Sequence, residues 1–460
     1  MGRSPRYNQL RMPHSLEAQL RQAGMGADAA SAHAAVLMRV GRAWRQWTAS
    51  EPVAWFVPGR IELLGKHTDY AGGRSLLCAV ERGFCVLAAP RRDGRVRLLD
   101  VDWHSQVEFA AGGPPPAHTP WAIYPATVAR RLALDFPAST AVLGADLAFA
   151  SSLPRAAGMS SSSALVVGSF LALADDAAAA QLGGRLQWAE YLAAVEGGRD
   201  GVGTHGGSED HTAILCCQPG QWSQFRFCPT RHEATLPAPA GKVLVIAVSG
   251  VVAAKTGAAQ AAYNRVAHRA AAVVQCWNSA TGAAHPHLAA LLAQHAPEEV
   301  RHRLRRHNHP EFSAASLLAR FDQFWRESEV LVPAAAAALA SSDWPGLGEC
   351  VAESQAAAVV GLENQTLETE ALVKSARALG AVAASAFGAG FGGAVWALVA
   401  RSEQRVFRRS WRADYARQFA ERARSSLFFV SAAGPAAFEL AWDASAAPEG
   451  TDGRHQLEPA

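Results

Sequence analysis

The segment "VPGRIELLGKHTDYAGGRSLL", residues 57–77, places a concentration of charge between two apolar runs. Within ten positions it holds an arginine, a lysine, a histidine and two carboxylates, at Arg60, Lys66, His67, Glu62 and Asp69. Short apolar runs that are broken by Gly and Pro are typical of β-strands and the turns between them. The segment therefore predicts a strand that leads into a charged loop, with a second strand after the loop.

The composition of the whole chain favours a small-molecule partner. With 460 residues, half of them hydrophobic, the chain is long enough for two domains. Its 43 basic and 40 acidic residues leave a net charge of +3, which gives no reason to expect a nucleic acid or a membrane as partner. Seven cysteines without a CxxC pair argue against a disulfide framework. No signal peptide or membrane-spanning run is apparent, so we expect a cytoplasmic protein.

The expected elements divide the chain into four parts. Residues 1–50 have the composition of a helical extension, residues 51–238 mix strands with helices, residues 239–443 form a second domain, and residues 444–460 are predicted to be a disordered tail. A proline-rich stretch at 233–241 is the expected boundary. Residues 163–182 are predicted to form one long apolar helix, and the basic cluster at 301–312 a solvated loop.

The segment "LPRAAGMSSSSAL", residues 153–165, predicts a phosphate site. Gly158 allows a sharp turn, four serines follow from Ser160 to Ser163, and a helix starts there, so free amides and the positive end of the helix dipole face outward. A serine-rich helix cap without a ligand is the alternative interpretation. The segment is not a P-loop, because no Gly-Lys-Ser/Thr ends it.

Two further segments are weaker signals by themselves. In "FGAGFGGAVWALV", residues 387–399, four glycines precede an apolar strand, and such a loop allows backbone amides to approach a ligand. In "HGGSEDHTAIL", residues 205–215, carboxylates stand at the start of a helix, where Asp210 could orient or deprotonate a hydroxyl or simply cap the helix.

Taken together and in this order, these segments and "AAYNRVAHRA" resemble the GHMP small-molecule kinases, and the segment at 57–77 resembles the galactokinase signature in particular. The resemblance covers roughly residues 53–402. It implies an α+β, two-domain GHMP kinase fold, with a ribosomal protein S5 domain 2-like N-terminal domain, a ferredoxin-like C-terminal domain and the active site in the cleft between them.

The resemblance also implies an ATP site. Residues that match the family's triphosphate loop are Gly158, Ser160, Ser161, Ser162 and Ser163, and Trp121 and Tyr124 match aromatic positions of the adenine site, although core packing would equally explain these two. One serine hydroxyl, that of Ser162, together with Glu196 resembles the family's Mg²⁺ pair. Hard oxygen ligands suit this ion.

For the phosphoryl acceptor, the resemblance implies Asp210 as the catalytic carboxylate and Arg60 as the group that stabilises the transferring phosphoryl. Glu209 is a rival for the role of Asp210 but lies one residue out of register. The predicted sugar-binding residues are Lys66, His67, Asp69, Gly207 and Tyr263.

The main departure from the family pattern is a pair of charges. Galactokinases usually have Asn and Glu where this chain has Glu62 and Lys66. A lysine only donates hydrogen bonds and attracts a carboxylate, so one hypothesis is a uronic acid such as galacturonate as substrate. The alternative is that Glu62 and Lys66 form an internal ion pair and that galactose remains the substrate. Phe387 and His205 are smaller departures.

We therefore expect an ATP-dependent kinase of the galactokinase type, which phosphorylates the anomeric hydroxyl of galactose or a related hexose to give the sugar 1-phosphate. The alternatives are a galacturonate kinase and, from another class, a catalytically silent sensor of sugar and ATP. The expected partners are the sugar and ATP with Mg²⁺, with neither nucleic acid nor membrane, in a monomer or weak homodimer.

Overall fold

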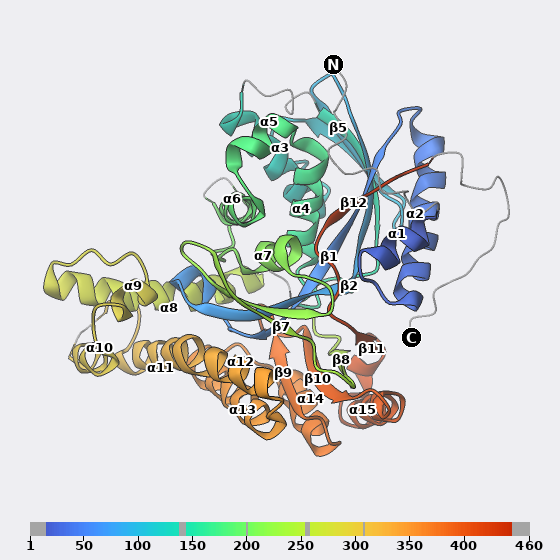
Figure 1. Ribbon diagram of the computed structural model, residues 1–460. Helices are drawn as coiled ribbons and strands as arrows, with labels where there is room; N and C mark the ends of the chain where they lie inside the picture. The colour runs from blue at the N-terminus through green and yellow to red at the C-terminus, as the bar shows by residue number, and fades with distance from the viewer. Residues whose placement is uncertain (1–14, 138–143, 199–200, 254–257, 307–308, 444–460) are drawn as a thin grey trace.

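The computed structural model describes residues 15–137, 144–198, 201–253, 258–306 and 309–443, which form two sheets with helices packed around them (Figure 1). The larger sheet has the strand order β12-β1-β2-β5-β3-β4, and β6 and β7 extend it from β2. Its strands are β1 (Val53–Leu64), β2 (Arg74–Pro90), β3 (Arg95–Asp100), β4 (Ser105–Ala110), β5 (Gly144–Ser151), β6 (Gln221–Arg226), β7 (Arg231–Pro237) and β12 (Phe438–Leu440).

Helices cover both faces of the larger sheet. Figure 1 shows α1 (Leu16–Gln22) and α2 (Ala27–Trp47) on one face and α3 (Ile123–Asp135), α4 (Ser161–Leu173) and α6 (Arg185–Gly197) on the other. The same part of the chain contains the short helices η1 (Asp69–Ala71), η2 (Pro120–Ala122) and α5 (Asp176–Leu182), and α7 (Glu209–Cys216). The apolar side of α1 and α2 buries Leu37 and Trp44 in one cluster with Phe56 and Leu87 of the sheet. The predicted helical extension is therefore a layer of the larger domain, as far as residues 15–50 are concerned.

The smaller sheet has the order β11-β8-β10-β9, and each neighbouring pair in it is antiparallel. Its strands are β8 (Lys242–Val248), β9 (Ala383–Phe387), β10 (Ala394–Ala400) and β11 (Leu427–Ser431). Helices separate β8 from β9 and β10 from β11, which is the βαββαβ succession of a ferredoxin-like domain. The predicted strand pair around the glycine loop is confirmed as β9 and β10.

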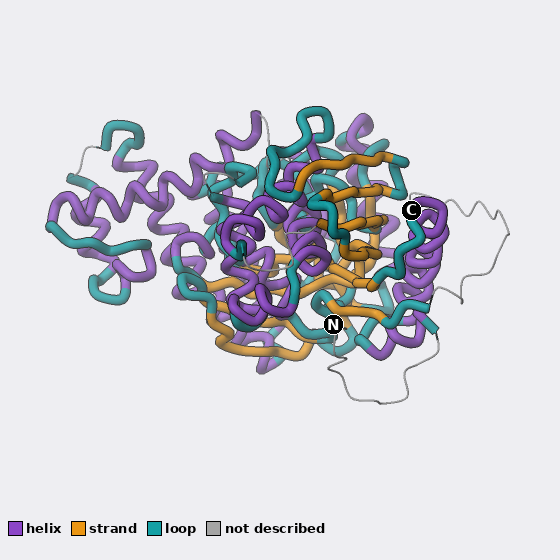
Figure 2. Tube along the Cα trace, turned by 90° about the horizontal axis from the view of Figure 1, so that it is seen from above, coloured by secondary structure: helices purple, strands orange, loops and turns teal. Residues whose placement is uncertain are grey.

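Between β8 and β9 the chain forms seven helices in its described part: α8 (Ala258–Thr281), α9 (Leu288–Leu292), α10 (Pro297–Leu304), α11 (Ala314–Trp325), α12 (Val332–Ser341), α13 (Trp344–Gly361) and α14 (Leu367–Ala378). A π-helical turn, η4 (Arg326–Leu331), joins α11 to α12, and α15 (Gln404–Gln418) and α16 (Ala420–Ala423) precede β11. Figures 1 and 2 show α8 to α11 projecting to one side of the sheets. Of the helices in the described ranges, none is long and apolar enough to span a membrane.

The structure corrects two predictions about elements. The helix predicted over 163–182 is two helices, because the Asp175 side chain accepts a hydrogen bond from the amide of Ala178 at 2.8 Å and caps a new start. The basic cluster begins in α10, where Arg301 contacts Asp322 at 2.6 Å. The predicted boundary at 233–241 includes the end of β7 at Pro237, in the larger sheet, and the chain enters the smaller sheet with β8 at Lys242. The predicted tail at 444–460 lies outside the described residues.

Strand β1 orients two charged groups toward the same side. Side chains alternate along a strand, so Arg60 and Glu62 share one face while Ile61 and Leu63 enter the hydrophobic core on the other. The pairing with β2 is regular through these positions, from Arg60 opposite Ala79 to Glu62 opposite Leu77. The alternation therefore holds both charges at the edge of the core.

The two domains meet where the serine loop contacts the glycine loop. Gly158 and Gly388 both have positive φ, and a Cβ on Gly388 would lie 2.6 Å from the carbonyl oxygen of Gly158. Contact this close excludes any side chain at Gly388. The glycines therefore let a loop of the smaller domain close onto the larger one.

We predict that Gly388→Ala lowers the free energy of unfolding by about 2–4 kcal/mol, because it adds a clash to the strain of a positive φ. Gly380→Ala is the matched control, since Gly380 also has a positive φ but an added Cβ would meet nothing within 4 Å. We expect this control to cost about 1 kcal/mol. Urea unfolding of both variants measures the difference, and equal losses would show that the contact between the loops is not tight.

Candidate active site

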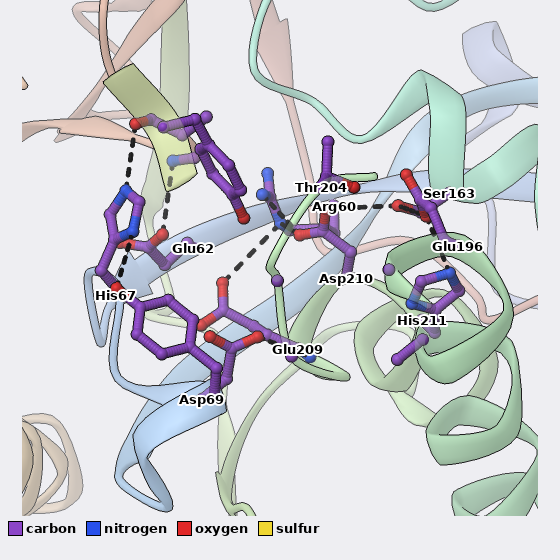
Figure 3. Close-up of a pocket in the computed structure, with 18 residues that line it drawn as sticks. Arg60, Glu62, His67, Asp69, Ser163, Glu196, Thr204, Glu209, Asp210 and His211 are labelled. Atoms are coloured by element: carbon purple, nitrogen blue, oxygen red, sulfur yellow. Dashed lines mark hydrogen bonds and ion pairs between the residues drawn. The ribbon is translucent and has the colours of Figure 1, made fainter. Parts of the chain in front are cut away.

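Two cavities meet at the serine loop. The larger one, of about 910 Å³, is lined by Gly158, Ser160, Ser161 and Ser162 from this loop. The smaller one, which we call the acidic pocket, lies beyond Ser163 and is drawn in Figure 3. Its charged, imidazole and hydroxyl side chains are those of Arg60, Glu62, His67, Asp69, Tyr70, Ser163, Glu196, Thr204, Glu209, Asp210, His211 and Tyr263. Ala389 of the glycine loop borders both cavities.

Arg60 and Asp210 form a buried ion pair in the wall of the acidic pocket, next to the serine loop. The Nε and Nη2 atoms of Arg60 donate to Oδ1 of Asp210 at 2.8 and 2.6 Å, and Nη1 donates to the carbonyl oxygen of Gly158 at 2.6 Å. Arg60 is 2% exposed and Asp210 8%. A guanidinium with several donors in one plane suits this double contact. It links β1, the serine loop and α7 at one point.

The other carboxylate oxygen of Asp210 faces the first turn of α4. Ser163 Oγ lies 3.3 Å from Asp210 Oδ2 and donates to Glu196 Oε2 at 2.9 Å. His211 Nε2 lies 3.0 Å from the same oxygen of Glu196. Two carboxylates and a hydroxyl are therefore gathered at the N-terminus of a helix, next to the loop that predicts a phosphate site.

The acidic pocket concentrates negative charge around one guanidinium. Burial alone would lower the pKa of Arg60, but Asp210, Glu209 and Glu62 outweigh burial and raise it. Burial raises the pKa of Glu209 well above its ordinary value, and Glu62 and Asp69 raise it further. Glu209 also accepts a hydrogen bond from Ser75 Oγ at 2.6 Å. A ligand that brings negative charge close to Glu62, Asp69 and Glu209 would therefore be repelled by these groups.

Four of the five predicted sugar-binding residues line the acidic pocket: His67, Asp69, Gly207 and Tyr263. His67 is held by the carbonyl oxygen of Ala389, 3.0 Å from its Nε2, and its ring lies 5.4 Å from that of Tyr263. Gly207 leaves no room for a side chain, because a Cβ there would lie 2.6 Å from Asp69 Oδ2. The structure therefore brings the charged loop of the first segment, α7 and α8 to one pocket.

Lys66 departs from its predicted place. It is 1% exposed, it does not line the pocket, and its Nζ donates to Ser354 Oγ of α13 at 2.9 Å. Ser354 in turn donates to Glu327 at 2.9 Å, and the same Glu327 oxygen accepts the Gly65 amide at 2.7 Å. These buried hydrogen bonds hold the Lys66 side chain against the smaller domain. Its ammonium group is therefore directed away from the sugar-binding residues.

Two smaller departures also have structural positions. Phe387 is buried in the main core cluster. His205 is exposed, and its Nδ1 lies 2.8 Å from Nε2 of His268. Neither side chain lines the two cavities.

The larger cavity combines apolar and polar walls. Trp121 and Tyr124 line it together with the serine loop, and Ser160 Oγ is buried without a hydrogen-bond partner among the described residues. Arg39 of α2 and Arg155, which the sequence did not single out, also line it. Arg155 lies over the ring of Trp103 at 4.2 Å. A cavity that is lined both by aromatic rings and by serine hydroxyls at a helix start fits a nucleotide.

The predicted pair for Mg²⁺ is split by the helix. Ser162 faces the larger cavity, whereas Glu196 faces the acidic pocket and contacts Ser163. Consecutive helical residues point roughly 100° apart, which places Ser162 and Ser163 on the two sides. In the described part of the chain no three His, Cys, Asp or Glu side chains are grouped to hold a metal. Mg²⁺ in kinases needs only one or two carboxylates beside the phosphates, so the oxygen donors present fit it.

Comparison with protein families identifies this arrangement. The sequence matches the galactokinase galactose-binding signature over residues 45–90, the GHMP kinases N terminal domain over 124–218 and the GHMP kinases C terminal domain over 335–417. The chain belongs to the GHMP kinase family. This GHMP kinase is a sugar kinase of the galactokinase-like type, a phosphotransferase with an alcohol group as acceptor.

Solved structures confirm the two-domain fold of this GHMP kinase. Lactococcus lactis galactokinase complexed with galactose matches with a TM-score of 0.74 and 22% identity, over 89% of this chain and 100% of that one. The Lin0012 protein from Listeria innocua matches with a TM-score of 0.54 and 13% identity, over 85% and 99%. A D-glycero-D-manno-heptose 1-phosphate kinase from Bacteriodes thetaiotaomicron matches with a TM-score of 0.50 and 12% identity, also over 85% and 99%.

Among the pocket residues that sequence reasoning missed are Glu62, His211, Thr204 and Tyr70. Glu62 was interpreted only as a partner of Lys66, yet it lines the pocket, and strand alternation with Arg60 was the signal that could have found it. His211 directly follows Asp210 at the start of α7 and reaches Glu196. Thr204 had no signal, because its place depends on the fold of the loop before α7.

We predict that Arg60→Met destabilises the kinase by about 3–5 kcal/mol at pH 7, because it leaves several buried carboxylates without their cation. The loss should shrink as the pH falls toward 5. Without Arg60 the pKa values of these carboxyls rise in the folded state, so the folded protein gains stability when it binds protons. Thermal and urea unfolding between pH 5 and 8 measure this.

The control is Arg95→Met, which breaks the exposed pair of Arg95 and Glu108 and should cost less than about 1 kcal/mol. A loss in Arg60→Met as small as that of the control, or one that grows toward low pH, would contradict the prediction.

Proposed function

We propose that this kinase transfers the γ-phosphate of ATP to the anomeric hydroxyl of galactose or a related neutral hexose, giving the sugar 1-phosphate. The observation that carries the proposal is the buried pair of Arg60 and Asp210, which lines the acidic pocket and is joined through Gly158 to the wall of the larger cavity. A phosphoryl donor on one side and a hydroxyl on the other would meet at this pair.

Different residues would bind each of the two substrates. Ser160, Ser161 and Ser162, with the free amides at the start of α4, would hold the triphosphate in the larger cavity, and Trp121 and Tyr124 would face the adenine. His67, Asp69, Gly207 and Tyr263 would surround the sugar. The close contact of the glycine loop would keep water away from the transferring group.

Asp210 would orient the attacking hydroxyl and accept its proton, while Arg60 would neutralise charge on the transferring phosphoryl group. Phosphoryl transfer needs little covalent help, so positioning and charge neutralisation are the main contributions. Of the predicted pair, Glu196 would hold Mg²⁺ from the acidic pocket, whereas Ser162, on the other side of the first turn of α4, would contact the triphosphate; the ion, when bound, would supply positive charge to the phosphates.

A uronic acid is a weaker candidate substrate. That hypothesis requires Lys66 to reach the sugar, whereas its Nζ donates to Ser354 and the pocket presents Glu62, Asp69 and Glu209. A sugar carboxylate placed among these groups would be repelled. A silent sensor with the same pocket would bind sugar and ATP without forming ADP.

We predict that coupled assays of ADP release with Mg-ATP show turnover of galactose or a related neutral hexose well above that of galacturonate and glucuronate. Asp210→Asn should lower kcat by about 100-fold to 10,000-fold, because it removes the proton acceptor and leaves the shape unchanged. Glu370→Gln, an exposed change on α14, is the control for expression and folding.

Three outcomes would change the proposal. Galacturonate as the best substrate would restore the uronate hypothesis. A loss confined to Glu209→Gln would move the catalytic role from Asp210 to Glu209. Sugar and ATP binding in calorimetry without ADP formation would favour the sensor.

A further inference from the structure

Glu62 has a free oxygen inside the acidic pocket. It is 2% exposed, it lines the pocket, and its Oε2 accepts the amide of Gly388 at 3.3 Å. Its Oε1 is buried and has no hydrogen-bond partner among the described residues. Figure 3 shows the side chain at the end of the pocket where His67 lies, with Asp210 and Ser163 on the other side of Arg60.

A buried carboxylate oxygen without a donor is costly, and folded proteins leave few such atoms unless a ligand or an ion completes them. Glu62 faces a cavity that holds the predicted sugar-binding residues His67 and Asp69. The missing donor would therefore come from the occupant of this cavity. Sugar hydroxyls are donors of this kind.

The charged groups around Glu62 come from several elements. Lys66 lies behind it in the following loop, Arg60 shares its strand, Glu209 approaches from α7 and Glu327 from η4. His67 is the imidazole at the same end of the pocket. Burial raises the pKa of Glu62 to about 7, against the opposing effect of Lys66 and then Arg60. The position of Lys66 is fixed by Ser354, which donates in turn to Glu327.

We propose that Glu62 is a specificity-determining residue of this kinase, whose Oε1 accepts a hydrogen bond from one hydroxyl of the sugar. Lys66 is the positioning residue, because its positive charge, outside the pocket, stabilises the negative charge of Glu62. The inference rests on the proposed function and names the part of the substrate that the pocket recognises. The proposal also explains the two departures from the family pattern together. Glu62 supplies an acidic group inside the pocket, and Lys66 supplies its counter-charge from outside the pocket.

The proposal defines a class of substrates. The sugar must carry a free hydroxyl that reaches Glu62, so replacing that hydroxyl by hydrogen removes a charge-assisted hydrogen bond. A carboxylate at the same position would bring two negative charges together. Neutral hexoses are accepted, whereas a sugar that is oxidised or lacks its hydroxyl at that position is rejected.

The first test combines Glu62→Gln with monodeoxy analogues of the best neutral hexose. We expect the variant to raise KM for the parent sugar about 10- to 100-fold, with KM for ATP unchanged, because one hydrogen bond to a charged group is lost. One deoxy analogue should show this penalty in the wild type and little further penalty in the variant. That analogue identifies the hydroxyl that Glu62 contacts.

The control for this test is Glu370→Gln, an exposed change on α14. Equal penalties for every deoxy sugar in wild type and Glu62→Gln would overturn the proposal, as would a fall in kcat with KM unchanged. Both results leave the proposed function standing as long as the wild type phosphorylates the sugar. Absence of turnover in the wild type would instead refute the proposed function.

The second test measures the role of Lys66 by pH. In the wild type, kcat/KM for the sugar should fall as the pH falls through about 7, because protonation removes the accepting charge of Glu62. Lys66→Met removes the charge that lowers the pKa of Glu62, so the fall should begin at higher pH. In Glu62→Gln this fall should be absent, and Lys374→Met, an exposed change on α14, should leave the profile as in the wild type.

A purely structural role for Lys66 would lower the melting temperature without moving the pH profile, and this result would overturn its part of the proposal. If kcat/KM fell over the same pH range in the wild type and in Glu62→Gln, the role proposed for Glu62 would be overturned.

Discussion

The guanidinium of Arg60 holds together three parts of the chain that are distant in the sequence. It leaves strand β1, donates twice to Asp210 on α7 and once to the carbonyl oxygen of Gly158 in the serine loop. Around it the pocket gathers several carboxylates in a buried space, which would repel one another without this cation. The relative position of the acceptor side and the phosphate side of the site therefore depends on one buried ion pair.

Close backbone contact is the second constraint. The serine loop and the glycine loop approach each other at Gly158 and Gly388, where a Cβ on Gly388 would collide with the backbone of Gly158. Because Ala389 of the glycine loop borders both cavities, the smaller domain completes a site whose charged groups come mainly from the larger one. This arrangement suits phosphoryl transfer, in which enzymes act mainly by placing two substrates and neutralising charge.

The charges at positions 62 and 66 illustrate how a site can change residues while it keeps its chemistry. Glu62 lies on the face of β1 that the pocket shares with Arg60, and Lys66 lies behind it, tied to Ser354 and Glu327. The pocket remains acidic although the acidic residue is not at the position that the family pattern predicts. Lys66 considered alone suggests an acidic sugar as substrate. Glu62 and Lys66 considered together do not, because the pocket keeps an acidic group.

The resemblance to the GHMP kinases predicted the two-domain fold. Local patterns were sufficient for the strand before the charged loop, the helix after the serine loop and the strand pair around the glycine loop, because each of these depends on neighbouring residues. The resemblance also proposed His67, Asp69, Gly207 and Tyr263, which the fold brings to one pocket. The break at Asp175 was missed because a capping side chain competed with a continuous apolar pattern. The direction of Lys66 was decided only by the tertiary structure, since its partners Ser354 and Glu327 lie more than 250 residues away and create a buried polar path. The separation of Ser162 from Glu196 was likewise decided in three dimensions, because one residue of helical rotation determines which cavity a hydroxyl faces.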